Sequence, residues 1–536
     1  MKIRSDIIKV YKDVHIWIGI VSGLMLFIAF YAGSVTMFEK PLERWATPPS
    51  TLSPAPSLQQ ADALVAAVLA EHPKAASRYF VSVRPHADQP ARVYWQERAP
   101  GQGRRQFTEY GASFAADGSL QVAQTRKAPV AQLVDTLHQL VGLPFPDNIA
   151  RPIMGAVAMA YAVTLVSGLI VLLITLSKDV FALRIGNNIK RMWLDAHNAL
   201  GLFSLPFHIV IALTSVVFAF HDQFYDAQGA VVYPQGIEWS EEHAEAPGGA
   251  AVLPAAELLR RVEQQLPGFE VQSFGFQNKG GHVEATVTGL DIRRGTRARV
   301  YASTHLDPYS GDVDAHDLPG HMDGWNGAVN AFFALHFGSF GGNPVRWLYL
   351  LMGLAGAALF YTGNLLWVES RRRKRKGAET PVQKRSAWVL ACLTVGVSLG
   401  CVAGISASIA ATKWLPSLVT DLKVWHTGIY YAVFVAAIAW AFVRGAPRAA
   451  VELLWLSALC TLAIPLSSVA GTLGIGGSWY HPGSWPVDLT PLLSVPVMLY
   501  IAHRSRLRMQ QGHTDSVWSQ GSAEPCSAEA LPANRL

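Results

Sequence analysis

The chain has 536 residues, of which 51% are hydrophobic and 15% charged, so it is too apolar for a single soluble domain and long enough for several membrane spans. Its formal net charge is +6 at pH 7, but the lysines and arginines gather beside apolar runs, where they orient helices rather than bind nucleic acid. Three of its four cysteines lie in apolar runs and Cys526 lies in a polar tail, which excludes a disulfide scaffold.

Eight apolar runs are long enough to cross a hydrocarbon layer of ~30 Å as helices. They cover residues 14–38, 153–176, 198–220, 345–368, 387–411, 424–443, 450–474 and 488–503. The first run has no small-residue cleavage site before Glu39-Lys40, so it predicts an uncleaved span rather than a signal peptide.

Positive charge is concentrated in five places. These are the N-terminus with Lys2, Arg4, Lys9 and Lys12, the loop with Lys178, Arg184, Lys190 and Arg191, the run from Arg371 to Lys376, the pair Arg444 and Arg448, and the group Arg504, Arg506 and Arg508. With eight spans all five fall on one side, which predicts a bacterial inner-membrane protein with both termini in the cytoplasm and its two long connectors in the periplasm.

Both long connectors have the pattern of a small folded module, in which a helix precedes several strands. In the first connector these elements are expected at Ser57–Glu71, Tyr79–Arg84 and Arg92–Gln96, followed by a hairpin ending at Asp117-Gly118. In the second they are expected at Ala255–Leu266, Val271–Phe276, His282–Thr288 and Arg297–Ala302. The predicted fold class is a polytopic α-helical membrane protein with about eight spans and two small α+β periplasmic domains.

The expected order along the chain has ten segments. They are a first transmembrane helix (1–38), a periplasmic domain (39–150), a second transmembrane helix (151–178), a cytoplasmic loop (179–196), a third transmembrane helix (197–220), a second periplasmic domain (221–344), a fourth transmembrane helix (345–370), a basic cytoplasmic loop (371–386), an additional four-helix transmembrane region (387–505) and a cytoplasmic polar tail (506–536).

The first ~370 residues contain one unit twice, by alignment of the sequence with itself. Asp13, His15, Gly19 and Ser22 align without a gap on Asp195, His197, Gly201 and Ser204. In the returning helices, Leu137-His138 aligns on Leu335-His336 and, after a three-residue slip, Ser167-Gly168 aligns on Thr362-Gly363. An internal repeat of this kind predicts a pseudo-symmetric bundle with functional sites where the halves meet.

The repeated histidines are candidate haem ligands. His15 and His197 sit at the predicted cytoplasmic ends of helices, and His138 and His336 sit near the periplasmic surface. A pseudo-twofold axis would pair His15 with His197 and His138 with His336. Two axial imidazoles on one iron are a familiar haem arrangement, so the pattern predicts two haems stacked across the bilayer. Since no Cys-x-x-Cys-His motif occurs, coordination and packing alone would hold them.

Other interpretations of these residues stay open. The histidines could be interfacial residues hydrogen-bonded to headgroups or backbone. Gly19 and Gly201, four residues after the first pair, could leave room for a flat macrocycle or allow close helix packing. His208 lies about three turns after His197 and could replace one ligand of the outer haem, although its counterpart is Leu26. His426 is kept as a spare candidate.

The sequence contains no Gly-rich nucleotide-binding motif and no His-Glu-x-x-His or Gly-x-Ser-x-Gly motif. Electrons would therefore arrive from a separate partner. A transporter is also disfavoured, because no Asp or Glu lies in the middle of the first four predicted spans.

The first ~375 residues resemble the PepSY-associated transmembrane family. The resemblance rests on two His-x-x-x-Gly openings, on two returning spans with Ser-Gly or Thr-Gly, and on a segment similar to the terminal hairpin of a PepSY module. These are His15–Gly19, His197–Gly201, Ser167-Gly168, Thr362-Gly363, Leu335–Gly338 with Gly341-Gly342, and Leu306–Gly311. The residue His208 and the four spans from Ala387 depart from the family pattern.

The resemblance implies an inner-membrane oxidoreductase with two b haems between its helices, similar to reductases of ferric siderophores. It would carry electrons from a cytoplasmic reductase or a quinol to a ferric siderophore or other Fe(III) chelate in the periplasm, releasing Fe(II). The alternative is a non-enzymatic periplasmic sensor or regulator of proteases, since PepSY modules elsewhere have such roles. This alternative explains the outer modules but leaves the paired histidines idle.

Overall fold

The computed structural model describes residues 4–85, 90–97, 107–125, 128–179, 189–221, 223, 230, 251–291, 293–295, 301–322, 324–371 and 384–510. The chain divides into a helical unit, with Met1–Ala46, Ala128–His221 and Trp347–Leu536, and a sheet unit, with Thr47–Lys127 and Asp222–Arg346. Some predicted features lie outside the described residues: Lys2, the side chain of Lys178, Arg184, residues 372–376, residues 297–300 of the strand predicted at Arg297–Ala302, and Cys526.

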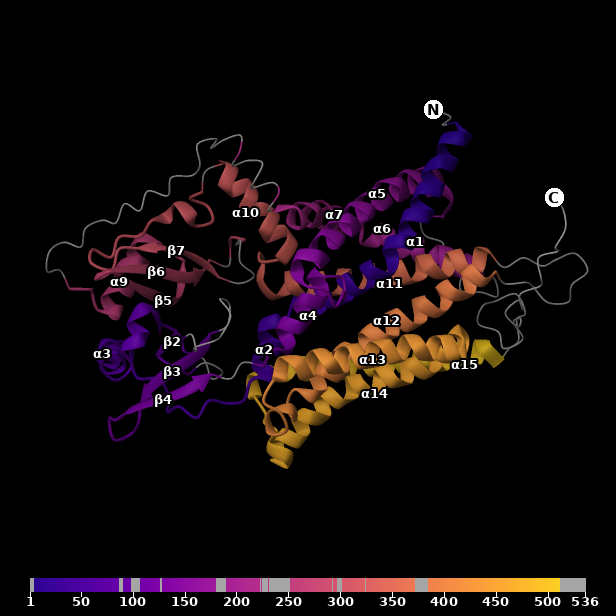
Figure 1. The fold of residues 1–536 in the computed structure, drawn as a ribbon. Coiled ribbons are helices and arrows are strands. Elements are labelled where there is room, and N and C mark those ends of the chain that lie inside the picture. Colours follow the sequence, from indigo (N-terminus) through magenta and orange to yellow (C-terminus); the bar gives the residue numbers. More distant parts are fainter. Residues whose placement is uncertain are drawn as a thin grey trace, which may run out of the picture. The chain divides into compact units, whose positions relative to one another are not determined.

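The helical unit is built from long apolar helices (Figure 1). Its helices are α1 (Ser5–Thr36), α2 (Glu39–Ala46), α4 (Val130–Gln139), α5 (Asp147–Asp179), α6 (Ile189–Phe203), α7 (Leu205–Ala219), α11 (Gly342–Ser370, from Trp347 on), α12 (Arg385–Ala411), α13 (Leu422–Arg444), α14 (Ala446–Thr472) and α15 (Trp485–Gln510). Seven are long and apolar enough to cross a membrane, or eight spans result if α6 and α7 count as one. The predicted polytopic helical fold is confirmed.

The third predicted span is bent. Where the sequence predicts one continuous helix over 198–220, α6 and α7 meet at Ser204 with a bend of 70°. Pro206 has no backbone N–H for the preceding turn, which breaks the helical ladder there. In α1 the corresponding position is Leu24, and that helix runs through without a break.

Among the four additional helices, α12 packs against α1, α13 and α14, and α15 packs against α14 (Figure 1). A buried polar cluster joins α2 to their ends. The ammonium of Lys413 donates to the Ser468 hydroxyl at 2.9 Å and lies 4.1 Å from the centre of the Trp45 ring. Ser468 and the Trp45 indole both donate to Asp488, at 2.8 and 3.0 Å. Burial lowers the pKa of Lys413 to about 8, although Asp488 opposes this shift.

The sheet unit contains one antiparallel sheet of seven strands in the order β4-β3-β2-β1-β5-β6-β7 (Figure 1). The strands are β1 (Tyr79–Ser82), β2 (Val93–Glu97), β3 (Thr108–Phe114), β4 (Leu120–Thr125), β5 (Glu270–Lys279), β6 (His282–Leu290) and β7 (Ala302–Leu306). The helices are η1 (Leu58–Gln60), α3 (Ala61–Glu71), η2 (Pro73–Ser77), α9 (Ala255–Gln265), η3 (Ala315–Asp317) and α10 (Gly324–Phe337).

Both modules contribute to this single sheet. Strand β1 of the first pairs with β5 of the second, in the register Tyr79↔Phe276 to Ser82↔Ser273. Leu64 of α3 and Leu258 of α9 share one buried core with both sets of strands. The predicted helix-then-strands order of each module is therefore present, but the two modules form one continuous layer.

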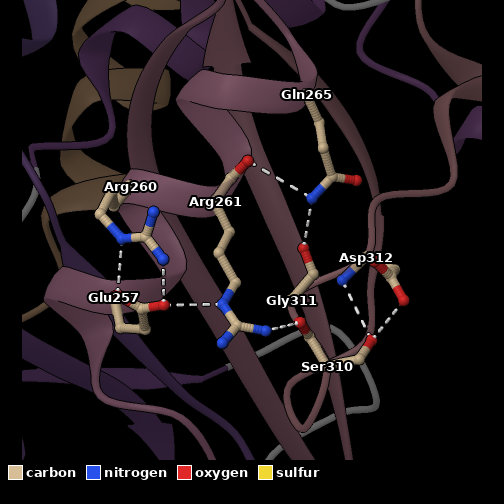
Figure 2. Close-up of polar contacts among 7 residues, drawn as sticks. All are labelled: Glu257, Arg260, Arg261, Gln265, Ser310, Gly311 and Asp312. Atoms are coloured by element: carbon tan, nitrogen blue, oxygen red, sulfur yellow. Dashed lines mark hydrogen bonds and ion pairs between the residues drawn. The ribbon is translucent and has the colours of Figure 1, made fainter.

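The segment similar to a PepSY hairpin is held by α9 (Figure 2). Gln265 donates to the carbonyl of Gly311 at 2.7 Å, and the Arg261 guanidinium donates to the carbonyl of Ser310. A side chain at Gly311 would collide with Arg261, and its φ of 75° also favours glycine. Glu257 accepts from Arg260 and Arg261, which lowers the pKa of this carboxyl to about 2.

Candidate functional site

The structure brings His15 and His197 together. His15 lies on α1 and His197 on α6, and the centres of their rings are 6.1 Å apart with an angle of 68° between the ring planes. The two residues are separated by most of the first repeat in sequence and occupy equivalent positions of the two halves. The pairing therefore follows the pseudo-symmetry of the helical unit.

Each of these rings is oriented by a backbone carbonyl of the returning helix in its own half. His15 Nδ1 lies 2.9 Å from the carbonyl of Thr164 on α5, and His197 Nδ1 lies 3.1 Å from that of Leu359 on α11. Because a carbonyl only accepts, Nδ1 carries the hydrogen in both rings and Nε2 keeps its lone pair in the neutral imidazole. Such a bond on one nitrogen is how proteins orient an imidazole whose other nitrogen ligates a metal.

A glycine one turn after each carbonyl makes room for the ring. An added Cβ would lie 2.6 Å from His15 Cε1 at Gly168, and 3.1 Å from His197 Cε1 at Gly363. The sequence had shown Ser167-Gly168 and Thr362-Gly363 only as matching residues of the repeat, without a role. Their recurrence in both halves was the only indication of a role in the sequence. The structure shows that each glycine leaves room for a histidine ring.

Gly19 and Gly201 have a different environment. A Cβ at Gly19 would meet the methyl group of Thr164 at 3.3 Å, and one at Gly201 would meet Leu359 at 3.5 Å. Both glycines thus face the helix that holds the neighbouring histidine. These contacts fit the close helix packing that the sequence left open as the alternative to a macrocycle space.

His138 repeats the arrangement of the first pair. Its Nδ1 lies 2.8 Å from the carbonyl of Ala29 on α1, and Gly33, one turn further along α1, would place a Cβ 2.8 Å from that nitrogen. His336 lies half-buried on α10 of the sheet unit, beside the ring of Phe337. The pairing of His138 with His336 involves both units and stays a prediction.

His208 is buried in α7 among aromatic rings of α1, α5 and α11. Its Nδ1 lies 2.6 Å from the hydroxyl of Tyr161, which also donates to the His208 carbonyl at 3.1 Å. The ring centres of Phe30 and Phe360 are 5.5 and 6.4 Å away. The Nε2 of His208 is buried without a hydrogen-bond partner in the described part of the chain. An unpaired buried nitrogen is costly, so a ligand for it would offset that cost.

The donor set fits a haem better than a bare metal ion. Among the described residues no group of three or more His, Cys, Asp or Glu side chains could hold a metal, whereas a haem brings four equatorial ligands and needs two axial ones. The rings of His15 and His197, with centres 6.1 Å apart, are the two side chains that would hold the iron of a haem at this place.

Among known families, the model described as the PepSY-associated TM region matches residues 13–370. The match covers more than half of the chain and includes α1 from residue 13 on, all of α5, α6, α7 and α11, and the sheet unit. No curated protein matches the chain.

Proposed function

Because the chain belongs to the PepSY-associated TM family, we propose that its paired histidines hold haem b and that it is an inner-membrane oxidoreductase. It passes electrons across the membrane from a cytoplasmic reductase or a quinol to an acceptor in the periplasm. The acceptor is a ferric siderophore, whose Fe(III) is reduced and released as Fe(II) for iron uptake.

The observation that carries the proposal is the arrangement of His15 and His197. Each imidazole donates from Nδ1 to a carbonyl of a transmembrane helix, which fixes the ring and leaves Nε2 for an iron. When bound there, haem supplies one-electron exchange between ferric and ferrous iron. Gly168 and Gly363 leave room for the two rings beside these carbonyls.

His138 supplies one ligand of a second haem. It has the same combination of carbonyl and glycine as the first pair, here from Ala29 and Gly33. The other ligand of this haem would be His208, through its buried Nε2, or His336, as the repeat predicts. Two haems at different depths would divide the distance across the bilayer into shorter electron-transfer steps.

The rival function is a periplasmic sensor or protease regulator without a cofactor. The continuous sheet of the sheet unit is the observation that favours it, since an exposed sheet could bind peptides or proteins. That function gives no role to two histidine rings that face each other within a membrane helix bundle.

An absorption spectrum of the purified full chain before and after dithionite tests the proposal. We expect a Soret band that shifts on reduction and two haems per chain by pyridine haemochrome. His15→Ala and His197→Ala should each remove the same haem, whereas His316→Ala, an exposed histidine of the sheet unit, should remove none. His138→Ala should remove the other haem, together with either His336→Ala or His208→Ala.

A colourless protein would refute the proposal and favour the sensor. Release of Fe(II) from a ferric siderophore, followed with a chromogenic Fe(II) chelator, then tests the acceptor. If the haem protein reduces other one-electron acceptors but no ferric siderophore, the acceptor assignment is wrong while the haem assignment stands.

A further inference from the structure

A cavity of about 280 Å³ lies in the helical unit between α1, α12, α13 and the loop that follows α4. Its wall is apolar and includes Ile28, Val141, Gly142, Val397, Phe434 and Ile438. The cavity lies between the duplicated part of the chain, which supplies α1 and the loop after α4, and the additional helices α12 and α13. The family match does not include these additional helices. Cavities of this size and composition accommodate small apolar ligands or part of a larger one.

The loop at this cavity has a strained backbone. Val141 has a φ of 48°, which a β-branched residue rarely adopts, and it is the only described non-glycine residue with positive φ. Gly142 follows with a φ of 73°, and a Cβ there would lie 3.0 Å from Ile28. This conformation turns Val141 into the cavity wall. Strain of this kind persists where surrounding structure enforces it, and it concentrates at functional sites.

Polar groups are confined to one part of the cavity's surroundings. The Tyr431 hydroxyl donates to the Gly142 carbonyl at 3.3 Å. The hydroxyl of Tyr430 is fully buried, has no oxygen or nitrogen partner in the described chain, and lies 3.7 Å from the Cβ position of Gly142. The Cys401 thiol is its polar neighbour. A thiol is only a weak hydrogen-bond partner, so an apolar cavity with this buried hydroxyl beside it suits an amphiphile whose polar head can hydrogen-bond and whose tail is apolar.

The cavity is also next to a candidate haem ligand. His138 precedes Val141 by three residues, and the Gly142 amide donates to the carbonyl of Leu137 at 2.9 Å. The imidazole of His138 and the cavity therefore contact the same part of α1, at Ala29 and Ile28 respectively. A reductant bound in the cavity would therefore lie close to His138.

We propose that this cavity binds an isoprenoid quinol, which serves as the electron donor, with its head group toward Tyr430. The inference rests on the proposed haem function, and it selects the quinol over a cytoplasmic reductase. In the overall reaction one quinol gives up two electrons and two protons and becomes the quinone. Both quinol O–H bonds break, the protons go to water, and the electrons reduce two Fe(III) ions of the acceptor to Fe(II).

The test uses the full chain in detergent, with decyl-ubiquinone as the probe in isothermal titration calorimetry. Val397→Trp should fill the cavity and abolish binding, while Val443→Trp, at an exposed position of α13, should leave it unchanged. Tyr430→Phe keeps the ring and removes one hydrogen bond, so it should weaken binding about fivefold. Organic extraction of the purified protein should yield a quinone.

The inference is overturned if the wild type does not bind decyl-ubiquinone, if both cavity variants bind as the wild type does, or if extraction yields only phospholipid. Its failure is distinguishable from failure of the haem proposal. A chain without a Soret band whose binding is lost in Val397→Trp refutes the haem and supports the cavity. A haem protein that decyl-ubiquinol reduces equally fast in Val397→Trp and wild type refutes the cavity alone.

Discussion

The substitution Gly168→Ala probes the histidine site most directly. The new Cβ would lie 2.6 Å from His15 Cε1, and ordinary contact begins at 3.4 Å, so the ring must retreat by at least 0.8 Å, the difference between the two. This movement breaks the 2.9 Å hydrogen bond from Nδ1 to Thr164, which contributes ~1 kcal/mol. Overpacking adds ~1–3 kcal/mol. Together these costs of ~2–4 kcal/mol should weaken haem binding at this pair by about 30- to 700-fold.

The pseudo-symmetric partner and an unrelated helix supply matched controls. At Gly363 the Cβ would lie 3.1 Å from His197, so the ring needs to move by only 0.3 Å to reach ordinary contact. Gly363→Ala should therefore weaken haem binding by about tenfold or less. At Gly428 of α13 a Cβ meets nothing within 4 Å, so Gly428→Ala should leave haem content unchanged. Haem per chain, measured by pyridine haemochrome over a titration with added haem, gives the three affinities. If Gly168→Ala binds haem as tightly as Gly428→Ala, Gly168 has no role in holding the ligand.

Two further predictions concern stability and pH. Lys413 has a folded pKa of about 8, below its unfolded value of 10.5, so the unfolded state binds more protons between these values and thermal stability should rise from pH 8 to 10.5. Lys413→Met should remove this rise and destabilise the chain by ~1–3 kcal/mol, because the partly buried Asp488 loses the cation beside it. Lys413→Met combined with Asp488→Leu should recover much of this loss. An unchanged melting temperature in Lys413→Met would contradict the buried cluster. Glu257 has a folded pKa of about 2, below its unfolded value of 4.5, so the stability that its ionised carboxylate contributes should be lost as the pH falls from 4.5 to 2. In Glu257→Gln, acid unfolding followed by circular dichroism should show a smaller decrease in stability over this pH range. If Glu257→Gln and the wild type lose stability equally in acid, the loss arises from other carboxylates and not from Glu257.

The sequence predicted the helices well because crossing a membrane demands long apolar runs, and such runs are visible without knowledge of contacts. It did not predict the bend at Ser204, although Pro206 was visible, because whether a proline bends or ends a helix depends on its neighbours in space. The sequence also did not predict that the strands of the two modules form one sheet. The pairing of Tyr79 with Phe276 joins strands almost two hundred residues apart, and nothing in the alternating pattern of either strand names its partner.

For the candidate site, recurrence was a stronger signal than residue type. His15 and His197 were paired from the alignment of the two halves, and their rings do lie together. The contribution of Thr164 and Leu359 could not be predicted, since a backbone carbonyl carries no sequence signature. The buried environment of His208 depends in the same way on the bend before it and on Tyr161 from another helix. The ligands of the outer haem stay a prediction.

The antiparallel pairing of β1 with β5 has an evolutionary consequence. Equivalent strands of two copies meet at the middle of the sheet, just as equivalent histidines meet at His15 and His197. This is the geometry of a twofold homodimer, so an ancestral gene with a single copy would have encoded a subunit that paired β1 with β1 and histidine with histidine. In one continuous chain the two halves are free to differ. Pro206 and His208 in the second half, where the first has Leu24 and Leu26, are changes that a homodimer would have had to accept twice.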